Sequence, residues 1–149
     1  MKHINQVISN MGPASKMATD NNSCTVKALS AAFSISYDDA HSFAAKEWNR
    51  VTGRGVRTSA MLQTFPIGFS NQSRALGKEI TRAKATSEYK QPNGTMLERA
   101  MNLSTFCKKH PRGTYYILVD GHALVITDGE VVDHSDRPKR RIKFAWKIS

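Results

Sequence analysis

The sequence predicts an α+β domain, in which helices from the first half of the chain pack on an antiparallel β-meander from the last third. Between residues 24 and 48, apolar side chains recur at three- and four-residue spacing, which is typical of buried helix faces. Between residues 114 and 133, runs of Val, Ile, Leu and Tyr flank an Asp-Gly turn, as in a β-hairpin. The length of 149 residues, at roughly 150 residues per domain, predicts a single domain over 1–149.

The composition is that of a globular protein and excludes several other classes. Hydrophobic residues make up 40% and charged residues 23% of the chain, which excludes a disordered, collagenous or coiled-coil protein. No stretch approaches the roughly 18 apolar residues of a transmembrane helix, so we expect no membrane partner. The apolar residues near Met1 are too scattered for a secretory signal. We therefore expect a cytoplasmic protein with Cys24 and Cys107 as free thiols.

The first helix is predicted over residues 24–33, after an irregular lead-in of residues 1–20. The lead-in is polar and contains a Gly-Pro pair, which disfavours regular structure. Residues 20–23 are Asp, Asn, Asn and Ser, all of which are favoured at helix N-caps. This cap places Cys24 in the first turn of an apolar, largely buried helix.

Two further helices are predicted before the middle of the chain. Ser36 and Asp39 stand three residues apart as in a capping box, so a helix is predicted over residues 37–48. Two glycines in the sequence VTGRGVRT end it. A short helix is predicted over residues 58–65, where Pro66 stops it.

The middle of the chain is open to two interpretations. Residues 66–94 form either an insertion or a loop, in which residues 80–83 are a candidate isolated strand. A T-x-x-E capping box then opens a helix predicted over residues 95–110 and ended by a proline. Cys107 lies on the apolar stripe of that helix, so its predicted role is packing.

Four strands are predicted in the last third of the chain. Asp-Gly pairs separate the first three strands, and apolar residues alternate along the fourth. The predicted strands cover residues 114–119, 122–127, 130–133 and 142–148.

A cysteine nucleophile needs a lowered pKa and a neighbouring base, and the sequence offers a candidate for each. Cys24 lies at a helix N-terminus, where the helix dipole favours the thiolate and backbone N–H groups can stabilise an oxyanion. Of the five histidines, His122 opens a strand directly after a Gly turn. From that position its imidazole can point off the end of the sheet into a cleft.

The hairpin register supplies a candidate third member of the site. If residues 128 and 129 form a two-residue loop, the flanking strands pair outward from it. His122 and Asp133 then project from the same face as diagonal neighbours, roughly 7 Å apart at Cα. The Asp133 carboxylate can accept the Nδ1 proton of His122 and orient the ring. His134 and Asp136 fall on the opposite face in this register.

In this order along the chain, the residues resemble the papain-like cysteine peptidase superfamily, and most of all its small bacteriophage-encoded, C39-like members. The resemblance spans about residues 20–136, with a poorly matched stretch near residues 56–94. It is carried by Asn22-Ser23-Cys24-Thr25-Val26-Lys27-Ala28-Leu29, by His110-Pro111-Arg112-Gly113-Thr114-Tyr115, and by Gly121-His122-Ala123 followed by Asp128-Gly129 and Asp133.

The resemblance implies a papain-like fold and a thiol hydrolase that cleaves a peptide or isopeptide bond in a protein or peptide substrate. It implies that Cys24 is the nucleophile and that His122 is the base and later the acid. Asp133 would orient the imidazole. A phage-encoded enzyme of this kind would act in the cytoplasm of its host cell.

The chain departs from the family pattern at the oxyanion site. Papain-like enzymes usually place a glutamine several residues before the cysteine, but Ala18 stands six residues before Cys24 and the nearest upstream glutamine is Gln6. Asn22 is therefore the candidate side-chain donor. We expect no metal or other cofactor, because neither zinc-ligand spacing nor a Gly-rich phosphate loop is present.

A second hypothesis follows from the charge of the chain. Lys and Arg number 22 against 12 Asp and Glu, and the net charge of +10 favours polyanionic partners. In this hypothesis the chain is a catalytically silent papain-fold protein, in a virion or in host takeover, that binds nucleic acid or an acidic host protein. Acyl transfer by the same triad, as in transglutamination, is a third hypothesis. The candidate polyanion-binding residues are Lys108, Lys109, Arg112, Arg137, Lys139, Arg140, Arg141 and Lys143.

Overall fold

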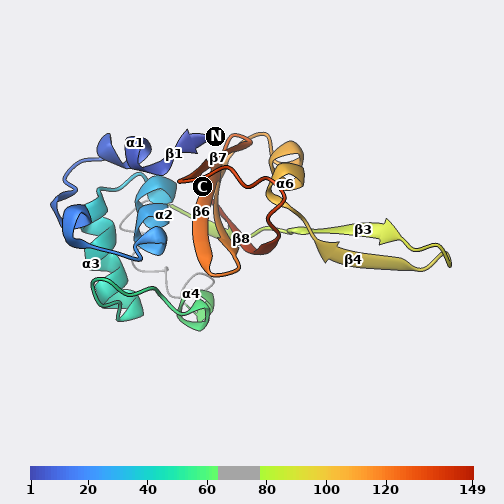
Figure 1. The fold of residues 1–149 in the computed structure, drawn as a ribbon, viewed down its shortest axis with the longest axis horizontal. Helices are drawn as coiled ribbons and strands as arrows, with labels where there is room; N and C mark the ends of the chain where they lie inside the picture. Colours follow the sequence, from blue (N-terminus) through green and yellow to red (C-terminus); the bar gives the residue numbers. More distant parts are fainter. Residues whose placement is uncertain (64–77) are drawn as a thin grey trace.

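The computed structural model describes residues 1–63 and 78–149, and it has a mixed α+β architecture (Figure 1). A six-stranded sheet has the order β1-β7-β6-β5-β8-β2, and β3 and β4 form a separate two-stranded sheet. All strand pairs are antiparallel except β1 with β7. Helices α1, α2 and α3 lie on one side of the six-stranded sheet, and α6 lies on the other (Figure 1).

The predicted β-meander is confirmed for its first three strands, whereas the fourth, β8, crosses back to pair with β5 and not with β7. The register of β6 and β7 places Thr127 opposite Glu130 and Val125 opposite Val132, as the two-residue Asp-Gly loop predicts. Along β5, Tyr116 faces the helices on one side while Ile117 faces α6 on the other. The four strands are β5 (Thr114–Val119), β6 (His122–Thr127), β7 (Glu130–Asp133) and β8 (Ile142–Ile148).

Two of the predicted helices form where the sequence places them. These are α2 (Cys24–Phe33) and α3 (Tyr37–Trp48). The Ser36 side chain caps α3 by accepting a hydrogen bond from the Asp39 N–H. The third, α4, covers Thr58–Gln63, and the rest of its predicted range lies outside the described residues.

The prediction of an irregular lead-in over residues 1–20 is wrong. The chain starts with β1 (Lys2–His3) and α1 (Ile4–Ser9), and a 3-10 turn, η1, covers Ser15–Thr19. Ile4 and Ile8 lie four residues apart and are fully buried on one face of α1. This pair is too short a pattern to stand out in the sequence, but it anchors the segment to the core.

The candidate strand at residues 80–83 forms, but it is not isolated. Ile80–Arg82 forms β2, which pairs with β8 as the edge strand of the six-stranded sheet. Within residues 66–94, the described part therefore contributes to the sheet and to the hairpin rather than forming only a loop or insertion.

The predicted helix over residues 95–110 forms only in its second half. Its first half is β4 (Met96–Ala100), which pairs with β3 (Thr86–Lys90) in a hairpin that projects from the rest of the molecule (Figure 1). The turn between the strands contains Gly94 at φ +88°, a backbone conformation that glycine adopts without strain. This turn favours the hairpin over the capping box that the sequence suggests at the same place.

The helix in this region, α6, covers Leu103–Lys109 and is capped at a different residue. Asn102 is the N-cap, and its side chain accepts a hydrogen bond from the Thr105 N–H at 2.8 Å. Cys107 is half-buried against the core between α6 and the sheet. Burial raises the pKa of its thiol, which fits a packing residue rather than a nucleophile.

Candidate active site

Cys24, His122 and Asp133 come together although about a hundred residues separate the first from the other two. Cys24 is the first residue of α2, and α2 packs directly on β6, which begins at His122. The His122 imidazole and the Cys24 thiol line the same cavity, and their interaction lowers the pKa of the thiol and raises that of the imidazole. Nε2 of His122 lies 2.8 Å from Oδ1 of Asp133, at the end of the neighbouring strand β7. The geometry is that of a nucleophile, a base and a carboxylate in series.

One detail of this chain of contacts differs from the sequence prediction. Asp133 binds Nε2 of His122, not Nδ1. The two residues are diagonal neighbours across the hairpin, so the carboxylate meets the far end of the ring. Nδ1 is therefore the nitrogen that is available to the thiol. Asp133 is fixed in turn, because its Oδ1 also accepts the His134 N–H at 2.7 Å.

The surroundings of Cys24 favour its thiolate. Burial on its own raises the pKa of the thiol, but the hydrogen bonds from His122 and from the Ala123 and Thr25 N–H groups outweigh it. The pKa of Cys24 therefore lies below its ordinary value. This is the direction that a cysteine nucleophile requires.

The same contacts raise the pKa of His122 to about 9, chiefly through the hydrogen bond to Asp133 and next through the bond to Cys24. For Asp133, burial raises the pKa, but the hydrogen bonds from His122 and His134 outweigh burial. The pKa of Asp133 therefore lies below its ordinary value. The shifts favour the charged form of all three groups, a thiolate, an imidazolium and a carboxylate. The side chains of His122 and Asp133 are only 18% and 5% exposed, so these charges interact with little screening by water.

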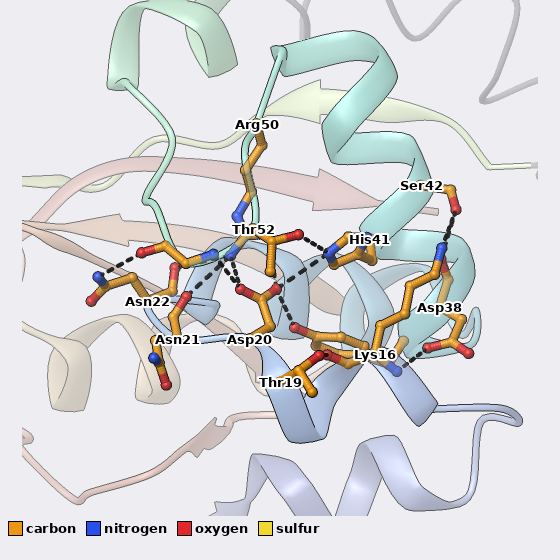
Figure 2. Close-up of polar contacts among 12 residues, drawn as sticks. Lys16, Thr19, Asp20, Asn21, Asn22, Asp38, His41, Ser42, Arg50 and Thr52 are labelled. Atoms are coloured by element: carbon orange, nitrogen blue, oxygen red, sulfur yellow. Dashed lines mark hydrogen bonds and ion pairs between the residues drawn. The ribbon is translucent and has the colours of Figure 1, made fainter.

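A buried ion pair fixes the loop that leads into Cys24 (Figure 2). The Arg50 guanidinium donates to both carboxylate oxygens of Asp20, at 2.8 Å each. The Gly53 N–H donates to Oδ1 of Asp20 at 2.8 Å, and the Tyr37 hydroxyl donates to Oδ2 at 2.7 Å. Arg50 also donates to the backbone carbonyls of Asn21 and Asn22. The residues directly before Cys24 are thereby tied to α3 and to the chain that follows it.

Sequence reasoning missed the role of this pair. Asp20 is identified only as one of several N-cap residue types before α2, and no pattern singles out Arg50. Burial raises the pKa of Asp20, but the hydrogen bonds from Arg50, Gly53 and Tyr37 outweigh it and bring the value to about 2. A buried, ionised aspartate four residues before a candidate nucleophile becomes evident only in the folded chain.

The candidate oxyanion donor Asn22 is partly committed elsewhere. Its Nδ2 donates to the Gly53 carbonyl at 3.1 Å, and its backbone has a positive φ of 51° (Figure 2). This bond uses one N–H of the amide to brace the loop, and Asn22 still lines the cavity beside Cys24. The backbone N–H groups in the first turn of α2 are the remaining candidates that the sequence suggests for an oxyanion.

A cavity of about 390 Å³ opens beside Cys24. The cavity has room for a few atoms on either side of a scissile bond. Because Cys24 and His122 both line it, a bound group can contact both side chains. A larger hollow of about 770 Å³ lies along β8 and the chain that leads from β2 into β3, but no cysteine or histidine lines it. The residues that line the smaller cavity are Asp20, Asn21, Asn22, Ser23, Cys24, Lys27, Gly121, His122 and His134.

The candidate polyanion-binding residues lie at the end of α6, in the segment after it, between β7 and β8 and, for Lys143, within β8. Three of them have partners: Lys143 lies 3.2 Å from Oδ1 of Asp120, Arg140 donates to the Asp120 carbonyl, and Arg141 donates to the Ala100 carbonyl. The others are exposed: Lys108, Lys109, Arg112, Arg137 and Lys139. The structure brings none of them into the cavity beside Cys24.

Comparison with known proteins adds no family to these observations. No protein-family model matches the chain, and no curated protein and no solved structure was found to match it. In residues 1–63 and 78–149, no three His, Cys, Asp or Glu side chains gather as a metal site would require. Over the same ranges, every helix is too short or too polar to cross a bilayer.

Proposed function

We propose that the protein is a papain-like thiol hydrolase that cleaves a peptide or isopeptide bond, with Cys24 as nucleophile, His122 as base and acid, and Asp133 as the residue that orients His122. The observation that carries this proposal is the series of contacts from Cys24 through His122 to Asp133, together with the lowered pKa of the thiol. The papain-like assignment of the fold is part of the same proposal, and the ordered motifs around these residues support it.

In the proposed reaction, the Cys24 thiolate attacks the carbonyl carbon of the scissile bond and forms a tetrahedral intermediate. Backbone N–H groups at the start of α2 stabilise the oxyanion. The His122 imidazolium then gives its proton to the leaving nitrogen as the C–N bond breaks, which leaves an amine and a thioester. Neutral His122 next takes a proton from water, whose oxygen attacks the thioester. The carboxylic product departs and the Cys24–His122 pair is restored.

The first half of this reaction can be tested without knowledge of the natural substrate. p-Nitrophenyl acetate is an activated acyl donor whose leaving group is coloured. We expect a burst of p-nitrophenol close to one equivalent per chain, with the acetyl group located on Cys24 by mass spectrometry. Asp133→Asn is expected to slow the burst by about two to four orders of magnitude, because an oriented imidazole is lost.

Cys107→Ser serves as the matched control, since it removes the other thiol of the chain and should retain the burst. Acetylation of Cys107 in place of Cys24 would contradict the proposal. Addition of a primary amine separates hydrolysis from acyl transfer, because only a transferase would pass the acetyl group to the amine in preference to water.

A polyanion-binding protein is the second candidate function, favoured by the exposed Lys108, Lys109, Arg112, Arg137 and Lys139 and by the net charge of +10. It would be supported by nucleic-acid affinity that falls steeply with salt and is unchanged in Cys24→Ala.

A further inference from the structure

Lys27 is a half-buried cation in the same cavity as the candidate nucleophile. It lies three residues after Cys24 on α2, so the two side chains share one face of the helix. The Lys27 Nζ donates to Nε2 of His134 at 3.3 Å. The rings of His3 and His134 pack edge to face, with 5.3 Å between their centroids.

No carboxylate in the described part of the chain lies within ion-pair distance of Lys27. The two negative groups that act on it are already engaged: Cys24 by His122, and Asp20 by Arg50. Half-buried charges are normally paired, because burial without a partner costs free energy. Burial accordingly lowers the pKa of Lys27. Cys24 and Asp20 act on Lys27 in the opposite direction, but each already has a cation of its own, so the ammonium group has no carboxylate partner to itself.

The cavity beside Cys24 is where an anion could contact Lys27. Lys27 and His134 line it together with Cys24 and His122. Side chains three residues apart on a helix are roughly 5–6 Å apart at Cβ. A group bound to Lys27 would therefore lie within about one residue of a carbonyl that is attacked by Cys24.

We propose that Lys27, held by His134, binds a carboxylate of the substrate next to the scissile bond. The inference rests on the proposed function, because it assigns a substrate class to the same site. The substrates would be peptides or amides with either an acidic side chain or a free terminal carboxylate beside the bond that is cleaved. Neutral substrates of the same shape would react more slowly.

Three iodoacetyl compounds test the proposed carboxylate site directly. Each alkylates the Cys24 thiol, whose sulfur displaces iodide from the reagent. They are iodoacetyl-glutamine amide, which is neutral, iodoacetyl-glutamate α-amide, with only a side-chain carboxylate, and iodoacetyl-glutamine, with only a terminal carboxylate. We expect the second-order rate for at least one of the acids to exceed that for the neutral compound by about five- to tenfold. Which of the acids reacts faster identifies the source of the carboxylate.

Variants of Lys27 assign the preference to this residue. The ratio of acid to neutral rates should fall to about one or below in Lys27→Gln and persist in Lys27→Arg. It should also persist in Lys108→Gln, a matched loss of charge on α6 away from the cavity. Use of the ratio cancels any change in the amount of thiolate.

Equal rates for all three compounds with the unaltered protein would overturn the proposal, as would a preference that survives Lys27→Gln. Failure of the proposed function has a different signature. In that case the neutral compound would react no faster with the unaltered protein than with His122→Ala, whatever the ratio between acid and neutral compounds.

Discussion

Replacement of Cys24 by alanine is expected to abolish acyl transfer from p-nitrophenyl acetate and all amide hydrolysis. Removal of a nucleophile that acts together with its base costs roughly six orders of magnitude in rate, since the remaining groups cannot form the acyl intermediate. The fold should persist, because Cys24 is small and only partly buried at the start of α2. We expect its free energy of unfolding in urea to change by less than about 1 kcal/mol.

Cys107→Ala is the control for this experiment, since it removes a thiol of similar exposure from the opposite side of the sheet. It should keep its activity. Retention of activity in Cys24→Ala, together with its loss in a folded Cys107→Ala variant, would show that the nucleophile is assigned to the wrong cysteine.

Of the substitutions described, Arg50→Ala is expected to lower the free energy of unfolding the most. The side chains of Arg50 and Asp20 are 1% and 0% exposed, and the substitution removes the guanidinium from the buried Asp20 carboxylate, which leaves only His41 at 3.5 Å. Removal of one member of a buried pair typically costs about 3–5 kcal/mol. The loop before Cys24 loses its anchor at the same time, so acylation of Cys24 should slow even where the variant is still folded. Urea denaturation and the p-nitrophenol burst measure the two effects.

The double variant Asp20→Asn/Arg50→Met tests whether the loss of stability in Arg50→Ala comes from the unpaired charge or from lost packing. It leaves no unpaired charge, so it should be more stable than Arg50→Ala. A double variant no more stable than Arg50→Ala would contradict the explanation.

The dependence of stability on acid pH provides a second check. The pKa of Asp20 is lowered to about 2, below its value in the unfolded chain, so its contribution is present at neutral pH. That contribution is lost as the pH falls from about 5 towards 2.

Local patterns in the sequence were enough to predict the elements that carry the site. The Asp-Gly turn at residues 128–129 has the tight geometry that fixes the register of β6 and β7, and the register then places His122 and Asp133 on one face. The cap residues before α2 likewise place Cys24 in its first turn. Each of these inferences depends on contacts only a few residues apart in the chain.

The features that sequence reasoning missed depend on contacts between distant segments. The parallel pairing of β1 with β7 and the pairing of Asp20 with Arg50 leave no periodic signal. At residues 95–100, two local signals compete, and the glycine turn at Gly94 prevails over the capping box. The choice of Nε2 over Nδ1 in His122 is set by side-chain reach, which register alone does not determine.

The central claim is that Cys24 and His122 form a thiolate–imidazolium pair at neutral pH. The most direct test is the rate of Cys24 alkylation by iodoacetamide as a function of pH, in the unaltered protein and in His122→Ala. The pair predicts a rate that is already high well below the ordinary thiol pKa of about 8.5 and a return to that ordinary profile in His122→Ala. A thiol that titrates near 8.5 in both proteins would contradict it.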